Sequence, residues 1–326
     1  MALIKLNSRA IPDDTVIASD IADGSISTAK LADDAVTGAK LYAENLGRRN
    51  LIINGAMQVA QRGTSFTPTS INTYSLDRWR SEGYSYDVDV TRQTFTSGQT
   101  DVEGFPQYYV TVALNETISA GQYWAFQQRI EKRQVIREGE QTFTLSFWAR
   151  ATSGTVAASS FSYGISSKEN SPELTTTWQK ITYTFTTTIS SSGDYASCYV
   201  IFFSPGATAT SIDIAQVQLE VGDTATPFEN RSYGEELSLC HRYYQDYTSN
   251  TGSGIYLNGT NEPSSEVLNS RFLPVVMRAN PSVFNATSTS GTVGGVGTDT
   301  RTLRYFTSSG HTGGGFSVQF ALESEL

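Results

Sequence analysis

The chain has 326 residues, enough for about two domains with cores of their own. Its net charge is −9, and its lysines and arginines form no stripe, which argues against a nucleic-acid partner and against an anionic membrane surface. It has no apolar run of about 18 residues and no signal-peptide pattern, so we expect neither membrane insertion nor general secretion. Two cysteines and two histidines, without metal-binding spacing, predict no disulfide framework, zinc site or cofactor.

The first 48 residues carry an apolar residue at every fifth position. The periodic residues are Leu6, Ile11, Val16, Ile21, Ile26, Leu31, Val36, Leu41 and Leu46. This spacing fits neither a coiled coil nor a strand, and the residues between are too polar for one chain to bury its apolar atoms alone. We therefore expect residues 1–48 to form an extended repeat stalk, in which identical chains bring these side chains together about one axis. A disordered acidic linker is the alternative that composition leaves open.

Short alternating segments dominate the chain from residue 49 to residue 231. Between Thr142 and Arg150 every second residue is apolar, which predicts a strand with one buried face. Similar strands are expected at Tyr108–Leu114, Gln179–Thr187, Ser197–Phe203 and Ser211–Val221. Because clusters of Gly, Ser, Pro and Asn separate them, residues 49–231 are predicted to form a jelly-roll β-sandwich.

A short helix is expected to link this sandwich to a second β-domain. Ser232 and Glu235 have the spacing of a capping box, and Leu237, Cys240 and Tyr244 would share one helical face within residues 232–247. Residues 248–326 are then predicted to form a smaller β-domain, with the glycine-rich Gly291–Gly297 as a turn or mobile tip. Its candidate strands are Ser270–Met277, Ser282–Ala286, Arg301–Thr307 and Phe316–Leu322. The predicted fold class is therefore mainly β.

Several stretches of the chain resemble bacteriophage tail fibre proteins. Arg49–Gly63, followed by Leu76–Trp79, is similar to the opening of the β-sandwich in many of these fibres. Ala215–Gly222, Ala225–Glu229 and Glu236–Gln245 resemble the end of that domain and its exit helix, while Phe272–Pro281 looks like the start of a fibre C-terminal domain. The repeats around the sequence SISTAKLADDAVTGAKL resemble fibre stalks as well.

The resemblance implies a homotrimeric virion protein, made in the host cytoplasm and attached through its N-terminus to other tail or baseplate proteins. Its β-domains would recognise the host cell and adhere to surface polysaccharide. A structural fibre or adaptor that docks other tail proteins is an alternative, and a polysaccharide depolymerase is a further one. We expect no enzyme, because the sequence shows neither a long β-helix repeat nor a nucleophile motif.

A glycan site needs exposed aromatic rings beside Asn, Gln, Asp or Arg, because a sugar has an apolar C–H face and a hydroxyl edge. A tryptophan inside an alternating strand, such as Trp148, is instead expected in the core. The candidates are Trp79, Tyr84, Tyr108 and Trp124 in the sandwich, and Tyr256, Asn258, Arg301, Tyr305 and Phe306 in the C-terminal domain.

More distantly, the sandwich resembles carbohydrate-binding modules that hold a structural calcium ion. The resemblance places its candidate ligands at Asn54 and Asp213. Ala56 and Gln58 stand where the first strand of such modules carries acidic ligands. Because Ca²⁺ needs several oxygen ligands with enough negative charge, we expect no metal ion at this position.

Overall fold

The computed structural model describes residues 21–22, 25, 49–68, 70–132, 136–165, 167–247, 255–257, 269–288, 292–298, 300–308 and 316–325. The chain divides into two compact units, Met1–Arg48 and Arg49–Leu326. Among the periodic apolar residues, Ile21 is described, and it is 43% exposed in the single chain. The other periodic residues lie outside the described ranges: Leu6, Ile11, Val16, Ile26, Leu31, Val36, Leu41 and Leu46. The stalk and its trimer stay predictions.

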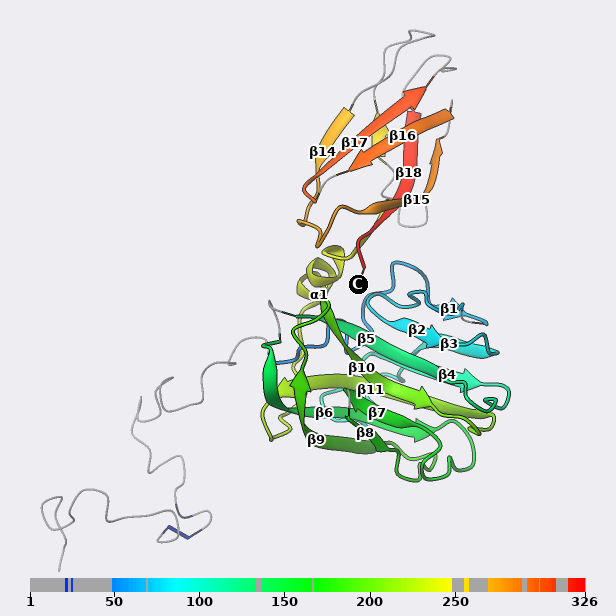
Figure 1. Cartoon of the computed structure of the whole chain (residues 1–326), viewed down its shortest axis with the longest axis vertical. Helices are drawn as coiled ribbons and strands as arrows, with labels where there is room; N and C mark the ends of the chain where they lie inside the picture. Colours follow the sequence, from blue (N-terminus) through cyan, green and yellow to red (C-terminus); the bar gives the residue numbers. More distant parts are fainter. Residues whose placement is uncertain are drawn as a thin grey trace, which may run out of the picture. The chain divides into compact units, whose positions relative to one another are not determined.

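Two antiparallel sheets form the expected β-sandwich (Figure 1). One has six strands in the order β1 (Ser65–Phe66), β3 (Val88–Thr94), β4 (Tyr108–Leu114), β11 (Thr210–Val221), β6 (Gly139–Ala151) and β9 (Gln179–Ile189). The other has five, in the order β2 (Arg80–Gly83), β5 (Trp124–Glu131), β10 (Tyr195–Phe203), β7 (Ser162–Ile165) and β8 (Ser167–Asn170). From β4 onward the chain passes repeatedly from one sheet to the other, as in a jelly roll, and the mainly β fold class is confirmed.

Alternating side chains make the core between these sheets. In β6, Phe143, Leu145 and Phe147 are buried in the core, as the period-two pattern predicts. The opposite sheet contributes Trp124 and Phe126, both fully buried. All five strands that the alternation predicted in the sandwich are present, with ends shifted by at most a few residues.

The helix α1 (Tyr233–His241) follows the sandwich and is shorter than expected. Its cap is confirmed, because the Ser232 hydroxyl accepts a hydrogen bond of 3.3 Å from the Glu235 amide. The predicted apolar face is wrong. Tyr244 lies beyond the helix in β12, and the buried helical residues are Glu236 and Cys240 rather than Leu237.

The C-terminal part contains two further antiparallel sheets. In one, β18 (Phe316–Glu323) pairs with β12 (Tyr244–Asp246), β13 (Ile255–Leu257) and β15 (Ser282–Ser288). In the other, β17 (Thr302–Ser308) lies between β14 (Asn269–Phe272) and β16 (Thr292–Thr298). The strands expected to begin near residues 282, 301 and 316 are therefore confirmed.

Two expectations about this C-terminal part are wrong. The strand predicted for Ser270–Met277 ends at Phe272, shortly before Pro274, which has no N–H to donate to a sheet. The segment Gly291–Gly297, expected as a turn, contains most of β16. Pairing with β17 overrides the weak strand preference of glycine there, and the register shifts between Val293 and Gly295.

Replacing Trp79 with alanine should destabilise the protein. Its ring is fully buried and stacks on Phe126 with ring centroids 5.0 Å apart, so truncation opens a cavity in the core. We expect the free energy of unfolding to fall by about 3–5 kcal/mol, measured by urea denaturation. An unchanged denaturation midpoint would contradict the assignment of Trp79 to the core.

Candidate functional site

The outer face of the five-stranded sheet carries aromatic side chains that do not belong to the core. In β5, Trp124, Phe126 and Ile130 point into the core, so Gln127 and Arg129 point the other way. In β10, Tyr199 stands opposite Gln127 in the strand register, and it therefore shares this outer face.

Four aromatic residues form a continuous band across this face. Tyr84 meets Tyr123 edge-on with ring centroids 6.0 Å apart, and Tyr123 stacks on Phe202 at 5.0 Å. Phe202 in turn meets Tyr199 edge-on at 5.4 Å. Tyr84 is 45% exposed and the other three are partly exposed. We call Tyr84, Tyr123, Tyr199 and Phe202 the tyrosine face.

Polar groups border the tyrosine face. The Glu82 carboxylate accepts hydrogen bonds from Arg80 at 2.6 Å and Arg129 at 3.2 Å, and also from the Gln127 side-chain amide. The Lys168 ammonium lies 4.8 Å from the ring centre of Tyr199 and 4.5 Å from that of Phe202. The face thus combines aromatic rings with hydrogen-bonding groups held in fixed positions.

Gln127 is one of these polar groups and is enclosed by the others. Its residue is fully buried, and the described chain gives its Oε1 atom no hydrogen-bond partner. A buried acceptor without a hydrogen bond lowers the free energy of unfolding, so the position of this oxygen needs an explanation. Because the atom is enclosed, a buried water molecule is the donor that would satisfy it.

Burial is the main cause that raises the pKa of Tyr123 and of Tyr199, and the negative charge of Glu82 raises both further. Both phenols therefore stay protonated at neutral pH, where each can donate and accept a hydrogen bond. The pKa of Lys168 is lowered by burial.

A hollow of about 330 Å³ adjoins the tyrosine face at the other end of β10. Its lining includes Lys168, Tyr195, Ser197 and Tyr199. The Arg129 guanidinium lies over the Tyr195 ring at 4.2 Å. Aromatic rings and polar groups thus continue beyond the four residues that define the face.

The candidates predicted in the sandwich have different places in the structure. Tyr84 lies on the tyrosine face. Trp79 and Trp124 were wrong choices, because both are fully buried in the core and present no ring to a ligand. Tyr108 is partly buried against that core and has the Arg92 guanidinium over its ring at 4.3 Å.

The candidates predicted in the C-terminal domain do not lie on one sheet. Tyr256 belongs to β13, whereas Tyr305 and Phe306 belong to β17 of the other sheet, and the structure describes these three by their backbone. Arg301 is exposed just before β17. Asn258 lies outside the described residues.

Sequence reasoning missed most of the tyrosine face. Tyr199 could have been predicted, because Tyr195, Ser197 and Tyr199 occupy every second position of β10 and alternate with buried residues. Phe202 could not, because a register shift between Tyr199 and Ile201 moves it onto the outer face. The band also joins strands that are far apart in the sequence.

Trp148 is not in the main core, contrary to expectation. Its strand turns Phe147 inward, so Trp148 points outward from the six-stranded sheet and is partly exposed. It lines a hollow of about 150 Å³ together with Lys180 and Gln216. It also packs against the small cluster around Trp178.

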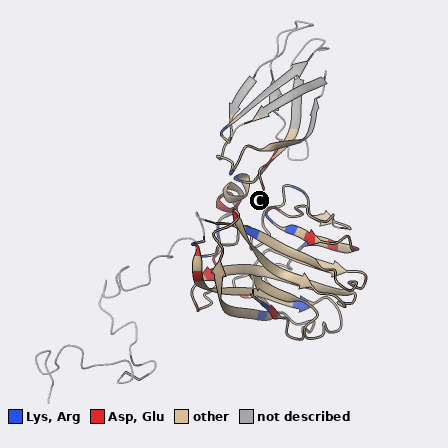
Figure 2. Cartoon of the chain, viewed as in Figure 1, with Lys and Arg blue, Asp and Glu red and all other residues tan. Residues whose placement is uncertain are grey.

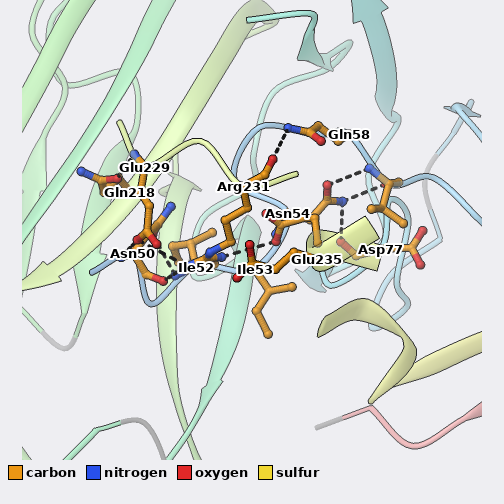
Figure 3. Close-up of polar contacts among 12 residues, drawn as sticks. Asn50, Ile52, Ile53, Asn54, Gln58, Asp77, Gln218, Glu229, Arg231 and Glu235 are labelled. Atoms are coloured by element: carbon orange, nitrogen blue, oxygen red, sulfur yellow. Dashed lines mark hydrogen bonds and ion pairs between the residues drawn. The ribbon is translucent and has the colours of Figure 1, made fainter. Parts of the chain in front are cut away.

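A buried polar network joins the first and last segments of the sandwich (Figure 3). Arg231 donates hydrogen bonds to the carbonyl oxygens of Asn50 and Ile52, and pairs with Glu236 at 3.4 Å. Glu236 also accepts from the Asn54 amide at 2.5 Å. The pKa of Glu236 is raised, chiefly by burial. Two segments that resemble tail fibres at opposite ends of the domain therefore meet here.

The calcium candidates do not form a cation site. Both side-chain groups of Asn54 are used within the network, by Val59 and by the Asp77 carbonyl. The Asp213 carboxylate is engaged by Arg150 at 2.9 Å and by Thr111 at 2.7 Å. Across the described ranges, no group of three or more His, Cys, Asp or Glu is placed to hold a metal ion.

The comparisons with known proteins add solved structures but no family. No family model and no curated protein matches the chain. The enzymatically active domain of tailspike protein 4 from bacteriophage CBA120 is similar at 17% identity, over 53% of this chain and 22% of that one, with a TM-score of 0.30.

Two carbohydrate-binding proteins match as well. A family 11 carbohydrate-binding module from Clostridium thermocellum, in complex with a mixed-linked tetrasaccharide, has 10% identity over 50% of this chain and 99% of that one, with a TM-score of 0.30. The CBM22-1 xylan-binding domain of Paenibacillus barcinonensis has 13% identity over 49% and 94%, with a TM-score of 0.29. At such scores the function has to be argued from this chain's own residues.

Neither the charges nor the helix of the described residues points to a particular surface partner. Figure 2 shows basic and acidic residues interspersed over the sandwich. Within the described ranges, no helix is long and apolar enough to cross a bilayer.

Replacing Arg231 with methionine should strongly destabilise the sandwich. The change leaves Glu236 buried without its cation and removes two hydrogen bonds to backbone carbonyls. We expect a loss of about 3–5 kcal/mol in the free energy of unfolding, measured by urea denaturation. The control is Lys180→Met, whose ion pair with Glu103 is exposed and should contribute less than about 1 kcal/mol. Equal effects of the two substitutions would contradict the structural role of the network.

The protein should lose stability in alkali. Burial is the largest cause that raises the pKa of Tyr74, Tyr163 and Tyr244 to about 12 each. Because these folded-state values exceed the unfolded value of about 10, the free energy of unfolding should fall as the pH rises from about 10 towards 12. Urea denaturation across that range measures it, and Tyr163→Phe should make the decline shallower. A decline unchanged in this variant would count against the assigned pKa of Tyr163.

Proposed function

We propose that this chain is a subunit of a homotrimeric bacteriophage tail fibre whose sandwich binds a host surface polysaccharide through the tyrosine face. The observation that carries the binding proposal is the band of Tyr84, Tyr123, Phe202 and Tyr199. Contacts between the rings stabilise the sheet, but they do not require the rings to be partly exposed, and exposed apolar patches mark interaction sites.

The chemistry of the band suits a sugar chain. Aromatic rings can stack on the C–H faces of pyranose rings, while the phenols of Tyr84, Tyr123 and Tyr199 can hydrogen-bond the sugar hydroxyls. The adjoining hollow at Tyr195 and Ser197 gives room for further sugar residues.

The proposal is for binding rather than hydrolysis. Glycan-cleaving enzymes use two carboxyl groups on either side of the scissile bond. Glu82 and Glu131 are the carboxylates on the outer side of β2 and β5, and each is already engaged. Glu82 is held by Arg80 and Arg129, while Glu131 accepts two hydrogen bonds of 3.1 Å from Arg242.

The tail fibre part of the proposal rests on the sequence resemblance and on the repeats of residues 1–48. An N-terminal stalk would attach the trimer to other tail proteins and hold three sandwiches together. Three weak sites on one stalk bind a repetitive polysaccharide far more tightly than one site does, because binding of the first raises the effective concentration of the others.

Replacing Tyr199 or Tyr84 with alanine should weaken binding to bacterial surface polysaccharides. We expect a loss of about tenfold or more for each, because removing an aromatic contact from such an interface costs about 1.4 kcal/mol or more. A glycan microarray of purified surface polysaccharides, probed with the labelled full chain, measures the change. The control is Tyr233→Ala, since Tyr233 is 56% exposed but belongs to α1.

Three other results would decide against the proposal. Binding that persists in both variants would place the site elsewhere on the chain. A wild-type chain that binds no polysaccharide would favour an adaptor that docks other tail proteins. Release of reducing sugar ends from a bound polysaccharide would show a depolymerase instead.

A further inference from the structure

A second cavity lies beside the tyrosine face and has a different character. It is a cleft of about 530 Å³, within the range of about 300–1,000 Å³ typical of ligand sites. The sandwich lines it with Arg62, Arg80 and Arg129, and the C-terminal segments contribute Arg278. We call these four residues and the space between them the arginine cleft.

Positive charge exceeds negative charge in the arginine cleft. Two carboxylates, Glu323 and Glu325, also line it, against four arginines. Glu323 and Glu325 both pair with Arg62, at 2.8 and 3.1 Å. The charge excess is notable because the whole chain carries a net charge of −9.

The carboxylates near the cleft are shared between arginines. Glu82 pairs with both Arg80 and Arg129. Glu325 pairs with Arg78 as well as with Arg62. Including Arg78, Glu82 and the buried Asp77, whose carboxylate interacts with Arg62, leaves an excess of one positive charge.

The guanidinium groups are held in place before any ligand arrives. Arg62 lies 3.5 Å from the ring centre of Tyr244, and Arg129 lies over Tyr195. Arg278 donates hydrogen bonds of 3.1 and 3.4 Å to the carbonyl oxygens of Ser324 and Glu325. Fixed guanidinium groups lose little conformational entropy when they bind an oxyanion, and their planar fork matches a carboxylate.

The cleft and the tyrosine face are neighbours on the five-stranded sheet. Arg80 and Arg129 line the cleft and also hold Glu82 beside the aromatic band. In the strand register Arg80 stands opposite Gln127, which in turn stands opposite Tyr199. A sugar chain on the tyrosine face would therefore bring its next residues to the arginines.

We propose that the arginine cleft binds the carboxylate of an acidic sugar in the polysaccharide that lies on the tyrosine face. This inference rests on the proposed function, since it names the class of glycan that the same site takes. The aromatic band would supply contact with the sugar rings, and the cleft would supply the preference for a uronic acid over its neutral counterpart.

Two oligosaccharides that differ in one group test this directly. Cellohexaose is neutral, and its C6-oxidised form carries a carboxylate in place of each oxidised hydroxymethyl group. We expect the full chain to bind the oxidised form about tenfold more tightly at low ionic strength, with the preference shrinking as salt is added. Isothermal titration calorimetry measures both affinities.

Variants on the two sides of the sandwich make the test specific. Arg80→Gln and Arg278→Gln should each reduce the preference for the oxidised form to within about threefold. The matched control is Arg150→Gln, since Arg150 pairs with Asp213 on the six-stranded sheet and should leave the preference unchanged. Thermal unfolding of each variant checks that it is folded.

The outcomes separate this inference from the proposed function. Equal affinity for the two oligosaccharides, or a preference kept in both cleft variants, overturns the arginine cleft as an acidic-sugar site. The acidic-sugar site is also overturned if the chain binds neither oligosaccharide but still binds surface polysaccharide in a way that depends on Tyr199. Binding to surface polysaccharide that is independent of both Tyr84 and Tyr199 overturns the proposed function itself.

Discussion

The sandwich depends on the buried contact between Arg231 and the segment that opens the domain. Arg231 brings a positive charge into the protein interior, where it is tolerated because Glu236 and two backbone carbonyls surround it. This contact holds the end of the domain against its beginning, and it fixes the start of α1. Arg62, Arg80 and Arg129 of the sandwich line one cleft with Arg278 of the C-terminal segments.

The five-stranded sheet has two faces with opposite roles. Its inner face buries Trp124 and Phe126, which stabilise the domain, whereas its outer face presents Tyr199 and Phe202 beside charged groups. Residues of both kinds alternate along the same strands, so a change of one residue in the register would exchange them. The shift in β10 is one place where the strand departs from strict alternation, and it places Phe202 in the band.

The sequence predicts the architecture better than the site, for physical reasons. Alternation within β4, β6 and β9 is a local signal, and it was enough to locate these strands and the sandwich. The short strands β7 and β8 carry too few residues to show a period, and β16 is a strand only through its pairing with β17. Trp79 and Trp124 were predicted as glycan-binding residues because the residue type alone does not show whether a side chain points into the core or towards solvent. The tyrosine face brings together residues that are far apart in the sequence, and no local sequence pattern can predict such a contact.

Hydroxyl-radical footprinting of the full chain, with and without a bound surface polysaccharide, tests the central claim most directly. It reports the solvent access of individual aromatic side chains. The account predicts that the polysaccharide protects Tyr84, Tyr123, Tyr199 and Phe202 from oxidation, while Trp148 and Tyr233 react as before. Protection of Trp148 with no change at the tyrosine face would contradict the account, and would place the glycan on the six-stranded sheet.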